Sequence, residues 1–318
     1  MKVLVTGANG FVGAAVCARL HADGWPVMGA YRGGAALGSP WPMVAVGTVD
    51  GHTDWMPALR GAQVVVHLAG RAHVMRDVVA DALVEYRRVN VEGTVNLARQ
   101  AARSGIRRLI FVSSIKVNGE QTRPNVPFTA ADLPAPQDAY ALSKWEAEQA
   151  LLALSAQTGL EVVVVRPPLV YGPGVRGNFL ALMRLLASGL PLPLGAVDNR
   201  RSLVALDNLV DLLVTLIAHP QAANRTLLVS DGEDVSTAEL LRRIGRALGK
   251  SARLLPVPVP VLRRAAGLLG WSARIGRLVD SLQVDPAQTR SLLGWSPPIS
   301  PDQALRCTAL EFLRTRVR

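Results

Sequence analysis

A tyrosine and a lysine four residues apart could carry out proton-transfer chemistry. Tyr140 and Lys144 lie in the segment Tyr-Ala-Leu-Ser-Lys, near the start of a helix-period stretch that Asp138 can cap, so their side chains should share one helical face. A nearby ammonium stabilises phenolate, and we expect Lys144 to lower the pKa of Tyr140 from its reference value of about 10. Such a tyrosine can exchange a proton with a hydroxyl or carbonyl near neutral pH.

Two serines, Ser113 and Ser114, follow the apolar run at residues 107–112. A hydroxyl at the end of a strand can hydrogen-bond a reacting oxygen and hold it beside the tyrosine. Paired serines at a strand end are usually structural when they occur alone. The tyrosine and lysine downstream, and a glycine-rich turn upstream, favour the catalytic interpretation.

The glycine-rich turn follows the first apolar run of the chain. It reads Thr-Gly-Ala-Asn-Gly-Phe-Val-Gly at residues 6–13, with Gly7, Gly10 and Gly13 spaced three apart. Glycine allows a tight turn and a close approach to a pyrophosphate, and the N–H groups and dipole of the following helix favour its negative charge. This position, between a predicted strand and helix, indicates dinucleotide binding.

The end of the second predicted strand bears on which dinucleotide is bound. NAD sites usually place an acidic residue there for the adenosine ribose. Here residues 27–32 read Val-Met-Gly-Ala-Tyr-Arg, and the guanidinium of Arg32 suits a 2′-phosphate. The sequence therefore favours NADP(H), with NAD(H) as the alternative if Arg32 is only a solvated arginine in an arginine-rich chain.

Alternating strands and helices must position these residues. Apolar β-rich runs occupy residues 2–5, 26–30, 44–46, 63–68, 107–112 and 161–165, and helix-period stretches occupy residues 11–23, 53–59, 79–103 and 138–158. The alternation predicts an α/β fold, a Rossmann-like doubly wound parallel sheet that binds ligands at the carboxyl ends of its strands. Frequent prolines after Arg166 predict a boundary between an NAD(P)-binding domain at 1–166 and a smaller α/β substrate lobe at 167–318, partly interleaved with the first. Further helices are expected at 178–188, 207–218 and 236–248, and one of them could fold back onto the sheet.

Composition and charge exclude several classes of protein. With 49% hydrophobic and 19% charged residues, the 318-residue chain is too apolar to be disordered, and it has no run of roughly 18 apolar residues for a membrane span. From Arg242 onward we count 14 basic and four acidic residues, so the net charge of +11 is concentrated at the C-terminal end and does not indicate a nucleic-acid coat. Cys17 and Cys307 form no metal-spaced pair and no export signal is apparent, so we expect a cytoplasmic protein without a metal site.

Motifs along nearly the whole chain resemble those of extended short-chain dehydrogenases/reductases of the nucleotide-sugar epimerase, dehydratase and reductase group. They are TGANGFVG at 6–13, HLAG at 67–70, Asn90 in VNVEGT, SSIKVNG at 113–119, YALSK at 140–144 and RPPLVYGPG at 166–174. The resemblance implies a catalytic triad of Ser114, Tyr140 as acid/base, and Lys144, which also holds the nicotinamide ribose. It implies a homodimer through the helices at 79–103 and 138–158. It implies cofactor contacts from Gly7, Gly10, Phe11, Val12, Gly13, Arg32, Leu68, Ala69, Gly70, Asn90, Val112, Tyr140, Lys144 and Pro167.

The resemblance also implies a UDP-sugar substrate. Ser114 and Tyr140 would contact the sugar, and Asn178 and Arg201 match residues that bind the nucleotide diphosphate in nucleotide-sugar enzymes. The alternatives are a helix N-cap for Asn178 and a surface charge for Arg201. His73, after the fourth predicted strand, could contact the sugar ring, although a lone histidine there is more often a packing or loop residue.

Departures from the family pattern narrow the reaction. Ile115 and Lys116 follow Ser114 where dehydratases of this group carry Asp-Glu, so dehydration is not expected; Lys116 could instead meet a phosphate or project from a loop. Leu169 replaces a substrate-binding asparagine of many epimerases. With Arg32, these departures favour an NADPH-dependent reductase. The sequence as a whole also resembles bacterial surface-polysaccharide enzymes, and this resemblance implies reduction of a UDP-4-keto-6-deoxy-N-acetylhexosamine in surface-polysaccharide precursor synthesis. The alternative is a UDP-hexose 4-epimerase acting on UDP-glucose or UDP-GlcNAc, and a remote one is a non-catalytic NADP-binding sensor.

The stretch VPVPVLRRAAGLLGW at residues 257–271 combines apolar residues with a basic pair. It could make a peripheral contact with an anionic membrane, since apolar and basic residues together suit such a surface. The alternative is an ordinary helix packed on the core of the substrate lobe. The sequence leaves both interpretations open.

Overall fold

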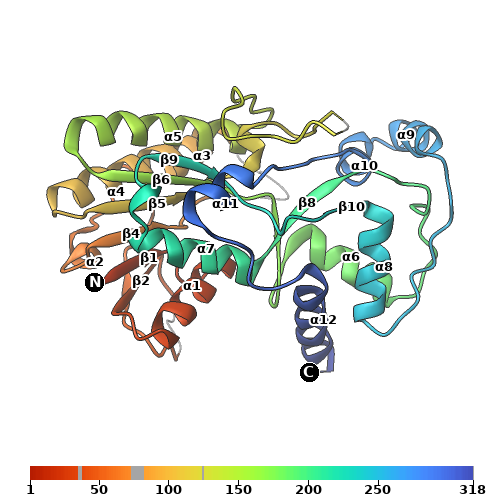
Figure 1. Ribbon diagram of the computed structural model, residues 1–318, viewed down its shortest axis with the longest axis horizontal. Coiled ribbons are helices and arrows are strands. Elements are labelled where there is room, and N and C mark those ends of the chain that lie inside the picture. Colours follow the sequence, from red (N-terminus) through yellow and green to blue (C-terminus); the bar gives the residue numbers. More distant parts are fainter. Residues whose placement is uncertain (35–37, 73–81, 124, 318) are drawn as a thin grey trace.

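The computed structural model describes residues 1–34, 38–72, 82–123 and 125–317 (Figure 1). Its larger sheet has seven strands in the order β3-β2-β1-β4-β5-β6-β9, and every pair is parallel. The strands are β1 (Val3–Thr6), β2 (Val27–Tyr31), β3 (Met43–Ala45), β4 (Val64–His67), β5 (Arg108–Val112), β6 (Glu161–Arg166) and β9 (Arg225–Leu228). The predicted doubly wound α/β fold is confirmed.

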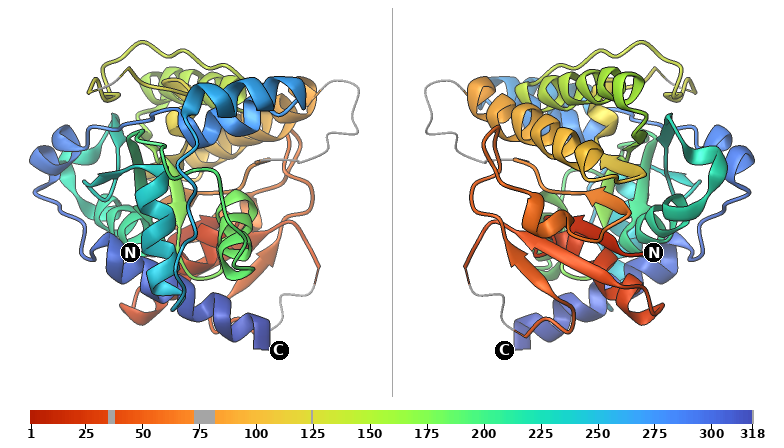
Figure 2. Two further views of the ribbon diagram at one scale, coloured as in Figure 1. Left: turned by 90° about the vertical axis from the view of Figure 1, so that its right-hand side faces the viewer. Right: turned by 90° about the vertical axis from the view of Figure 1, so that its left-hand side faces the viewer.

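Helices cover both faces of this sheet. On one face α4 (Gly93–Arg103) lies beside α5 (Ala139–Thr158), and on the other α1 (Phe11–Ala22) packs against α7 (Leu206–Ala218), as Figure 2 lets the reader follow. The valines of the central strand β4 are fully buried between these layers, which explains why its sequence does not alternate between apolar and polar residues. The helix α7 is thus the later helix that folds back onto the sheet.

A smaller lobe contains a three-stranded sheet in the order β10-β8-β7. Its elements are β7 (Leu169–Tyr171), β8 (Arg201–Ala205), β10 (Asp234–Val235), α6 (Gly177–Ala187), α8 (Thr237–Ala247), α9 (Val259–Leu268), α10 (Ser272–Val279) and α12 (Pro301–Val317). Between β8 and β10 the chain returns to the larger sheet through α7 and β9, and α11 (Ala287–Leu293) also contacts β9. The predicted boundary at residues 166 and 167 remains a prediction.

The helix predicted at residues 79–103 is interrupted. Where it is described, it consists of α3 (Ala82–Tyr86), a π-helical turn η1 (Arg87–Glu92) and α4. The other short elements are α2 (Met56–Leu59), η2 (Ile115–Val117) and η3 (Pro220–Ala222). Within the described ranges, no helix has the length and apolar character needed to cross a membrane.

Candidate active site

Ser114 and Tyr140 lie next to each other where β5 ends. Ser114 has extended backbone immediately before η2, and the hydroxyl of Tyr140, in the first turn of α5, is hydrogen-bonded to it. Asp138 accepts a hydrogen bond from the backbone N–H of Ala141 at 2.7 Å, which confirms the predicted N-cap of α5. The two hydroxyls therefore face one location, as a shared contact with a substrate oxygen requires.

Tyr140 is half-buried, and its surroundings favour the phenol over the phenolate. Burial raises the pKa of Tyr140 to about 12; the hydrogen bond with Ser114 opposes this rise, and Asp138 and Tyr86 add to it. The expected lowering of this pKa by Lys144 is wrong, because burial penalises the charged form most strongly. At neutral pH, Tyr140 is a proton donor.

Lys144 is held at the junction of β5 and the loop after β4. It is only 6% exposed, its Nζ donates to the backbone carbonyl of Val112 at 2.8 Å, and Nζ lies 4.3 Å from the centre of the Phe111 ring. Burial lowers the pKa of Lys144 to about 8, and the charge of Glu148 opposes that shift. A Cβ added to Gly70 would lie 3.7 Å from Nζ, so the ammonium also borders the β4 loop.

The π-helical turn η1 places Asn90 where it ties that loop to α5. The side chain is 1% exposed; its Oδ1 accepts the backbone N–H of Arg71 at 2.7 Å, and its Nδ2 donates to the carbonyl of Arg71 at 3.1 Å and to Oγ of Ser143 at 3.0 Å. π-Helical turns occur frequently at functional sites. Here the π-helical turn orients the side-chain amide of Asn90 so that it hydrogen-bonds the backbone of the loop after β4, next to Lys144.

His67, at the end of β4, is a site residue to which the sequence analysis assigns no role. Its Nδ1 lies 2.7 Å from Oγ1 of Thr6, and its Nε2 lies 2.9 Å from Oγ1 of Thr94. Since the Thr6 hydroxyl already accepts the N–H groups of Leu68 and Ala69, its own proton points to Nδ1, and Nε2 must donate to Thr94. Burial lowers the pKa of His67 to about 3, so a neutral ring locks β1 to the β4 loop. The only signal in the sequence is a histidine that ends an apolar run.

At Gly7 and Gly13 the glycine turn packs too closely to admit a side chain. A Cβ on Gly7, whose φ is +66°, would lie 2.9 Å from the backbone N of Ala69, and a Cβ on Gly13 would lie 2.1 Å from the carbonyl oxygen of Gly7. No side chain caps α1, whose N-cap is Gly10. The N–H groups of its first turn therefore suit an anion.

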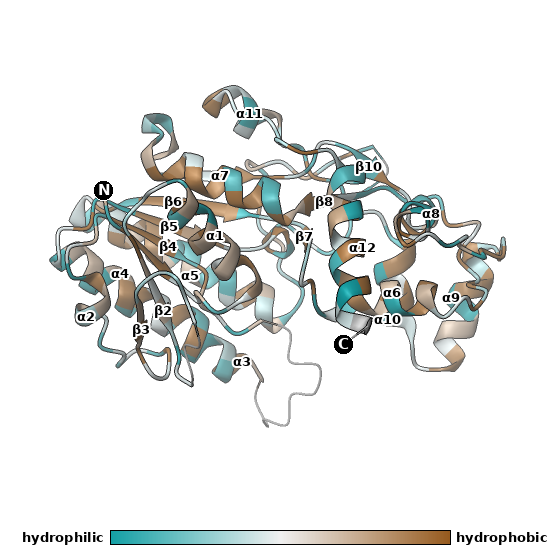
Figure 3. Cartoon of the chain, turned by 90° about the horizontal axis from the view of Figure 1, so that it is seen from below, coloured by the Kyte–Doolittle hydropathy of each residue, from teal (hydrophilic) through white to brown (hydrophobic). Residues whose placement is uncertain are grey.

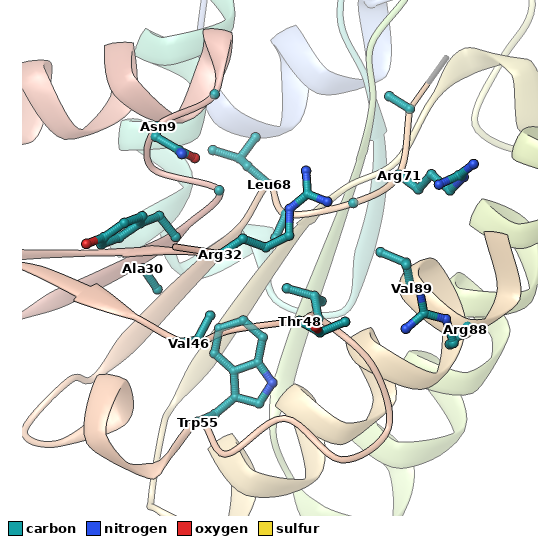
Figure 4. Close-up of a pocket in the computed structure, with 17 residues that line it drawn as sticks. Asn9, Ala30, Arg32, Val46, Thr48, Trp55, Leu68, Arg71, Arg88 and Val89 are labelled. Carbon is teal, nitrogen blue, oxygen red and sulfur yellow. The ribbon is translucent and has the colours of Figure 1, made fainter. Parts of the chain in front are cut away.

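A pocket of about 440 Å³ opens beside this turn, between the ends of β2 and β4 (Figure 4). Val46 and Trp55 form an apolar side of it, and Arg32 extends into it from the end of β2. In the described part of the chain, its lining includes Arg32, Arg71 and Arg88 and no carboxylate side chain. Among the described residues, the pocket therefore offers guanidinium groups and no carboxylate to a bound molecule.

The three arginines have different surroundings. Arg88 pairs with Glu85 at 2.9 Å, and the guanidinium carbon of Arg71 lies 5.6 Å from the centre of the Tyr86 ring. Arg32 is exposed and forms no ion pair with any residue that the structure describes. Of the three, Arg32 is therefore the most available to an added phosphate.

The remaining predicted cofactor residues lie at varying distances from the pocket. Gly7, Gly10, Leu68, Ala69 and Gly70 line it directly. Phe11 and Val12 start α1 and pack against the core, and the carbonyl of Pro167 accepts the backbone N–H of Ile115 at 3.0 Å beside Ser114.

The structure does not bring the predicted diphosphate residues into hydrogen-bond contact with the triad. Asn178 is exposed in the first turn of α6, whose N-cap is Arg176, so the capping alternative for Asn178 is wrong. Arg201 starts β8, half-buried, and its Nη1 donates to the carbonyl of Asp280 at 2.9 Å, so it is not a plain surface charge. His73 lies outside the described residues.

Lys116 neither projects freely nor faces an open phosphate site. Its Nζ pairs with Glu120 at 2.7 Å and with Asp138 at 2.5 Å. This contact joins the segment that carries Ser114 to the N-cap of the helix that carries Tyr140. It stabilises the approach of the two hydroxyls.

The sequence model of the NAD dependent epimerase/dehydratase family matches residues 3–229, which include the glycine turn and all three triad residues. The chain belongs to this family. It is an NAD-dependent enzyme of the short-chain dehydrogenase/reductase type, and the predicted family resemblance is confirmed. A UDP-glucose 4-epimerase of Vibrio cholerae is 47% identical over 318 residues, covering 100% of this chain and 97% of that protein.

Solved structures share the epimerase/dehydratase fold. A UDP-glucose 4-epimerase of Thermotoga maritima, determined with UDP-glucose, has a TM-score of 0.79 at 21% identity and covers 100% of both chains. RMD of Pseudomonas aeruginosa, determined with NADPH, has a TM-score of 0.73 at 22% identity and covers 98% of this chain and 99% of that one.

The residues present fit the nicotinamide dinucleotide that the epimerase/dehydratase family uses. Gly7 and Gly13 leave a cradle that a Cβ would fill, the start of α1 offers uncapped N–H groups, and the adjoining pocket has the apolar side that an adenine needs. Lys144 borders Gly70, which lines this pocket.

We expect Gly13→Ala to weaken NAD(P)H binding by at least about tenfold and to lower stability by about 1–3 kcal/mol, because the methyl group would overlap the backbone of Gly7. Fluorescence titration with NADH and NADPH, and thermal unfolding, measure the two effects. Gly267→Ala is the control, since a Cβ there meets nothing within 4 Å in α9. Unchanged cofactor affinity in Gly13→Ala would contradict the assignment.

Proposed function

We propose that the enzyme acts at C4 of a UDP-sugar and interconverts the C4 epimers of a UDP-hexose such as UDP-glucose or UDP-GlcNAc. The observation that carries this proposal is the 47% identity to the Vibrio cholerae UDP-glucose 4-epimerase along the full chain. That identity supports epimerisation better than the reduction of a 4-keto sugar, which the departures at Leu169 and Arg32 favour. Ser114, Tyr140 and Lys144 supply the groups that either reaction requires.

In this proposal, the triad handles the proton at the C4 oxygen. A nicotinamide dinucleotide held by the glycine turn and Lys144 would supply the hydride chemistry at C4. Ser114 would orient the oxygen by a hydrogen bond. Tyr140, whose raised pKa keeps it a phenol at neutral pH, must first give up its own proton; as phenolate it would then take the proton of the C4 hydroxyl and return it to the C4 oxygen. Lys144, anchored on the Val112 carbonyl, would hold the cofactor ribose.

A second candidate is the reduction of a UDP-4-keto-6-deoxy-N-acetylhexosamine by NADPH. The specific observation that favours it is the arginine-lined pocket without a carboxylate in the described lining. The high pKa of Tyr140 also suits a residue that only donates a proton. A non-catalytic NADP sensor is the remote third candidate.

Product analysis distinguishes these candidates. The purified enzyme is incubated with UDP-glucose or UDP-GlcNAc plus NAD⁺, and separately with UDP-4-keto-6-deoxy-GlcNAc plus NADPH, and products are identified by NMR. An epimerase yields both C4 epimers without net cofactor turnover, whereas a reductase oxidises one NADPH per keto sugar. Tight cofactor binding without any product would instead support the sensor.

We expect Arg32→Ser to weaken NADPH binding by about 10- to 100-fold and to leave NADH binding nearly unchanged, because a charge-assisted hydrogen bond to the 2′-phosphate is lost. Fluorescence titration of both cofactors measures the ratio. Arg60→Ser, which also removes an exposed arginine, should change neither affinity. Equal NADPH affinity in Arg32→Ser and the wild type would reject the 2′-phosphate role and favour NAD(H).

We also propose a homodimer through α4 and α5. The outer side of α5 carries partly exposed apolar side chains, Leu142 and Trp145, which a partner helix would cover. Light scattering of the purified enzyme tests this proposal, and a monomer at micromolar concentration would contradict it.

A further inference from the structure

One end of the substrate lobe exposes large apolar side chains beside arginines. We define the basic apolar tip by the residues Val261, Arg264, Leu268, Leu269, Trp271, Arg274 and Arg277 of α9, α10 and the turn between them. Figures 1 and 3 place these helices at the end of the molecule farthest from the N-terminus. The exposed fractions of the apolar members are 52% for Val261, 90% for Leu268, 59% for Leu269 and 50% for Trp271. Single exposed apolar side chains are common, but four within eleven residues mark an interaction surface.

The tip is a built feature of the fold. Leu262 and Ala266, four residues apart, bury one face of α9 in the lobe. Val261 and Leu268 lie on the opposite face with Arg264, at helical spacings of three and four residues. The backbone N–H of Trp271 donates to the carbonyl of Ala266 at 2.8 Å and fixes the turn. The fold thus holds the apolar side chains outward.

The arginines of the tip are not neutralised by the protein. Residues 240–279 contain nine basic and no acidic residues. Asp280 pairs with Arg263, whereas Arg264, Arg274 and Arg277 form no ion pair with any residue in the described ranges. Near the larger sheet, exposed Arg87 pairs with Glu146 at 2.6 Å, whereas exposed Arg32 forms no ion pair with any described residue. The positive charge of the tip favours binding to an anionic partner.

We propose that the basic apolar tip docks on the surface of a membrane that contains anionic phospholipid. Trp271 and the leucines match the apolar boundary of the acyl chains, where tryptophan is enriched, and the arginines match the lipid phosphates around it. A second copy of the chain fits poorly, since two such tips would bring like charges together. Nucleic acid would leave the four apolar side chains unmatched.

The proposal does not depend on the identity of the sugar substrate, and its test needs none. The enzyme is sedimented with vesicles of phosphatidylcholine alone or mixed with phosphatidylglycerol. We expect binding to the mixed vesicles at low salt, weak binding to phosphatidylcholine, and a loss of binding as salt screens the arginines. Fluorescence quenching by brominated phosphatidylglycerol vesicles should occur in the wild type and fall in Trp271→Phe.

Two sets of variants assign the contact. Replacing Arg264, Arg274 and Arg277 together by serine should lower the partition coefficient roughly 100-fold. Leu268→Ser with Trp271→Ser should lower it at least about tenfold. The matched controls are Arg60, Arg103 and Arg225 replaced together by serine, and Leu133→Ser at an 88% exposed position elsewhere. Both controls should bind as the wild type does, and all variants should keep the wild-type turnover.

Several outcomes would overturn the proposal. One is no sedimentation of the wild type with mixed vesicles at low salt. Another is equal loss of binding in tip and control variants, which would indicate a non-specific effect of net charge. Self-association that disappears with the tip variants, without vesicle binding, would identify a second copy as the occupant.

Discussion

Tyr140→Phe is expected to lower kcat by about 10²- to 10⁴-fold and to leave cofactor affinity nearly unchanged. The substitution removes only the hydroxyl that is hydrogen-bonded to Ser114 and that would exchange the proton of the C4 oxygen. The ring keeps its edge-on contact with Tyr86, whose centre is 6.0 Å away, so the start of α5 should stay in place. Initial rates with saturating cofactor, and a separate fluorescence titration of NAD(P)H, measure the two quantities.

Tyr86→Phe is the matched control for this result. Tyr86 is a buried tyrosine whose ring packs edge-on against that of Tyr140. Its replacement by phenylalanine also removes one phenolic hydroxyl, but it leaves Ser114, Tyr140 and Lys144 unchanged. We expect a change in kcat of less than about threefold, because the role of Tyr86 is packing. If Tyr140→Phe retained near-normal turnover, or if both variants lost activity equally, Tyr140 would not be the acid/base.

The strands could be predicted from the sequence where an apolar run of residues indicates a buried segment. The short valine run of β4 is typical of a strand covered on both faces, and β1, β2, β3, β5 and β6 begin and end within one residue of the predicted limits. The strand β9 was not predicted, because its four residues, Arg225–Leu228, carry no strong local pattern. It is a strand because β6, about sixty residues earlier, offers a free edge.

The shared helical face of Tyr140 and Lys144 could be predicted because their spacing is local, but the electrostatics around them could not. A separation of four residues on one helix places Tyr140 and Lys144 on the same face whatever the tertiary structure. Their pKa values depend instead on burial by the β4 loop and by η1, which only the fold determines. The π-helical turn that positions Asn90 could not be predicted either, because the periodicity of residues 79–103 is typical of one continuous helix.

A buried ion pair beneath the site was also not predicted, because its members lie on α5 and β6. Glu148 is 1% exposed and Arg166 is 4% exposed; Nη2 of Arg166 lies 2.5 Å from Oε2 of Glu148, and its Nε lies 3.1 Å from Oε1. Ser113 donates a hydrogen bond to the same carboxylate, and Arg166 donates to Oδ1 of Asn118 at 2.9 Å. Asn118 thus completes this network.

We expect Glu148→Gln to lower the free energy of unfolding by about 3–5 kcal/mol, because it leaves the guanidinium of Arg166 buried without its counter-charge. Chemical denaturation of the purified enzyme measures the loss. Glu146→Gln, on the same helix, is the control: its pair with Arg87 is partly exposed to solvent, and the expected loss is below about 1 kcal/mol. Equal losses in the two variants would show that Glu148 contributes no more than a surface charge.

The same substitution should also change the pH dependence of activity, which links the ion pair to the triad. The charge of Glu148 raises the pKa of Lys144, against the larger lowering by burial, so its removal should move that pKa below about 8. The ammonium would then be lost at a lower pH, and the alkaline limb of kcat/KM should shift downward in Glu148→Gln but not in Glu146→Gln. A combined Glu148→Gln and Arg166→Met variant should recover part of the stability, because no unpaired charge stays buried, yet it should keep the shifted pH profile. Recovery of both properties together would instead mean that Arg166, and not the lost carboxylate, controls Lys144.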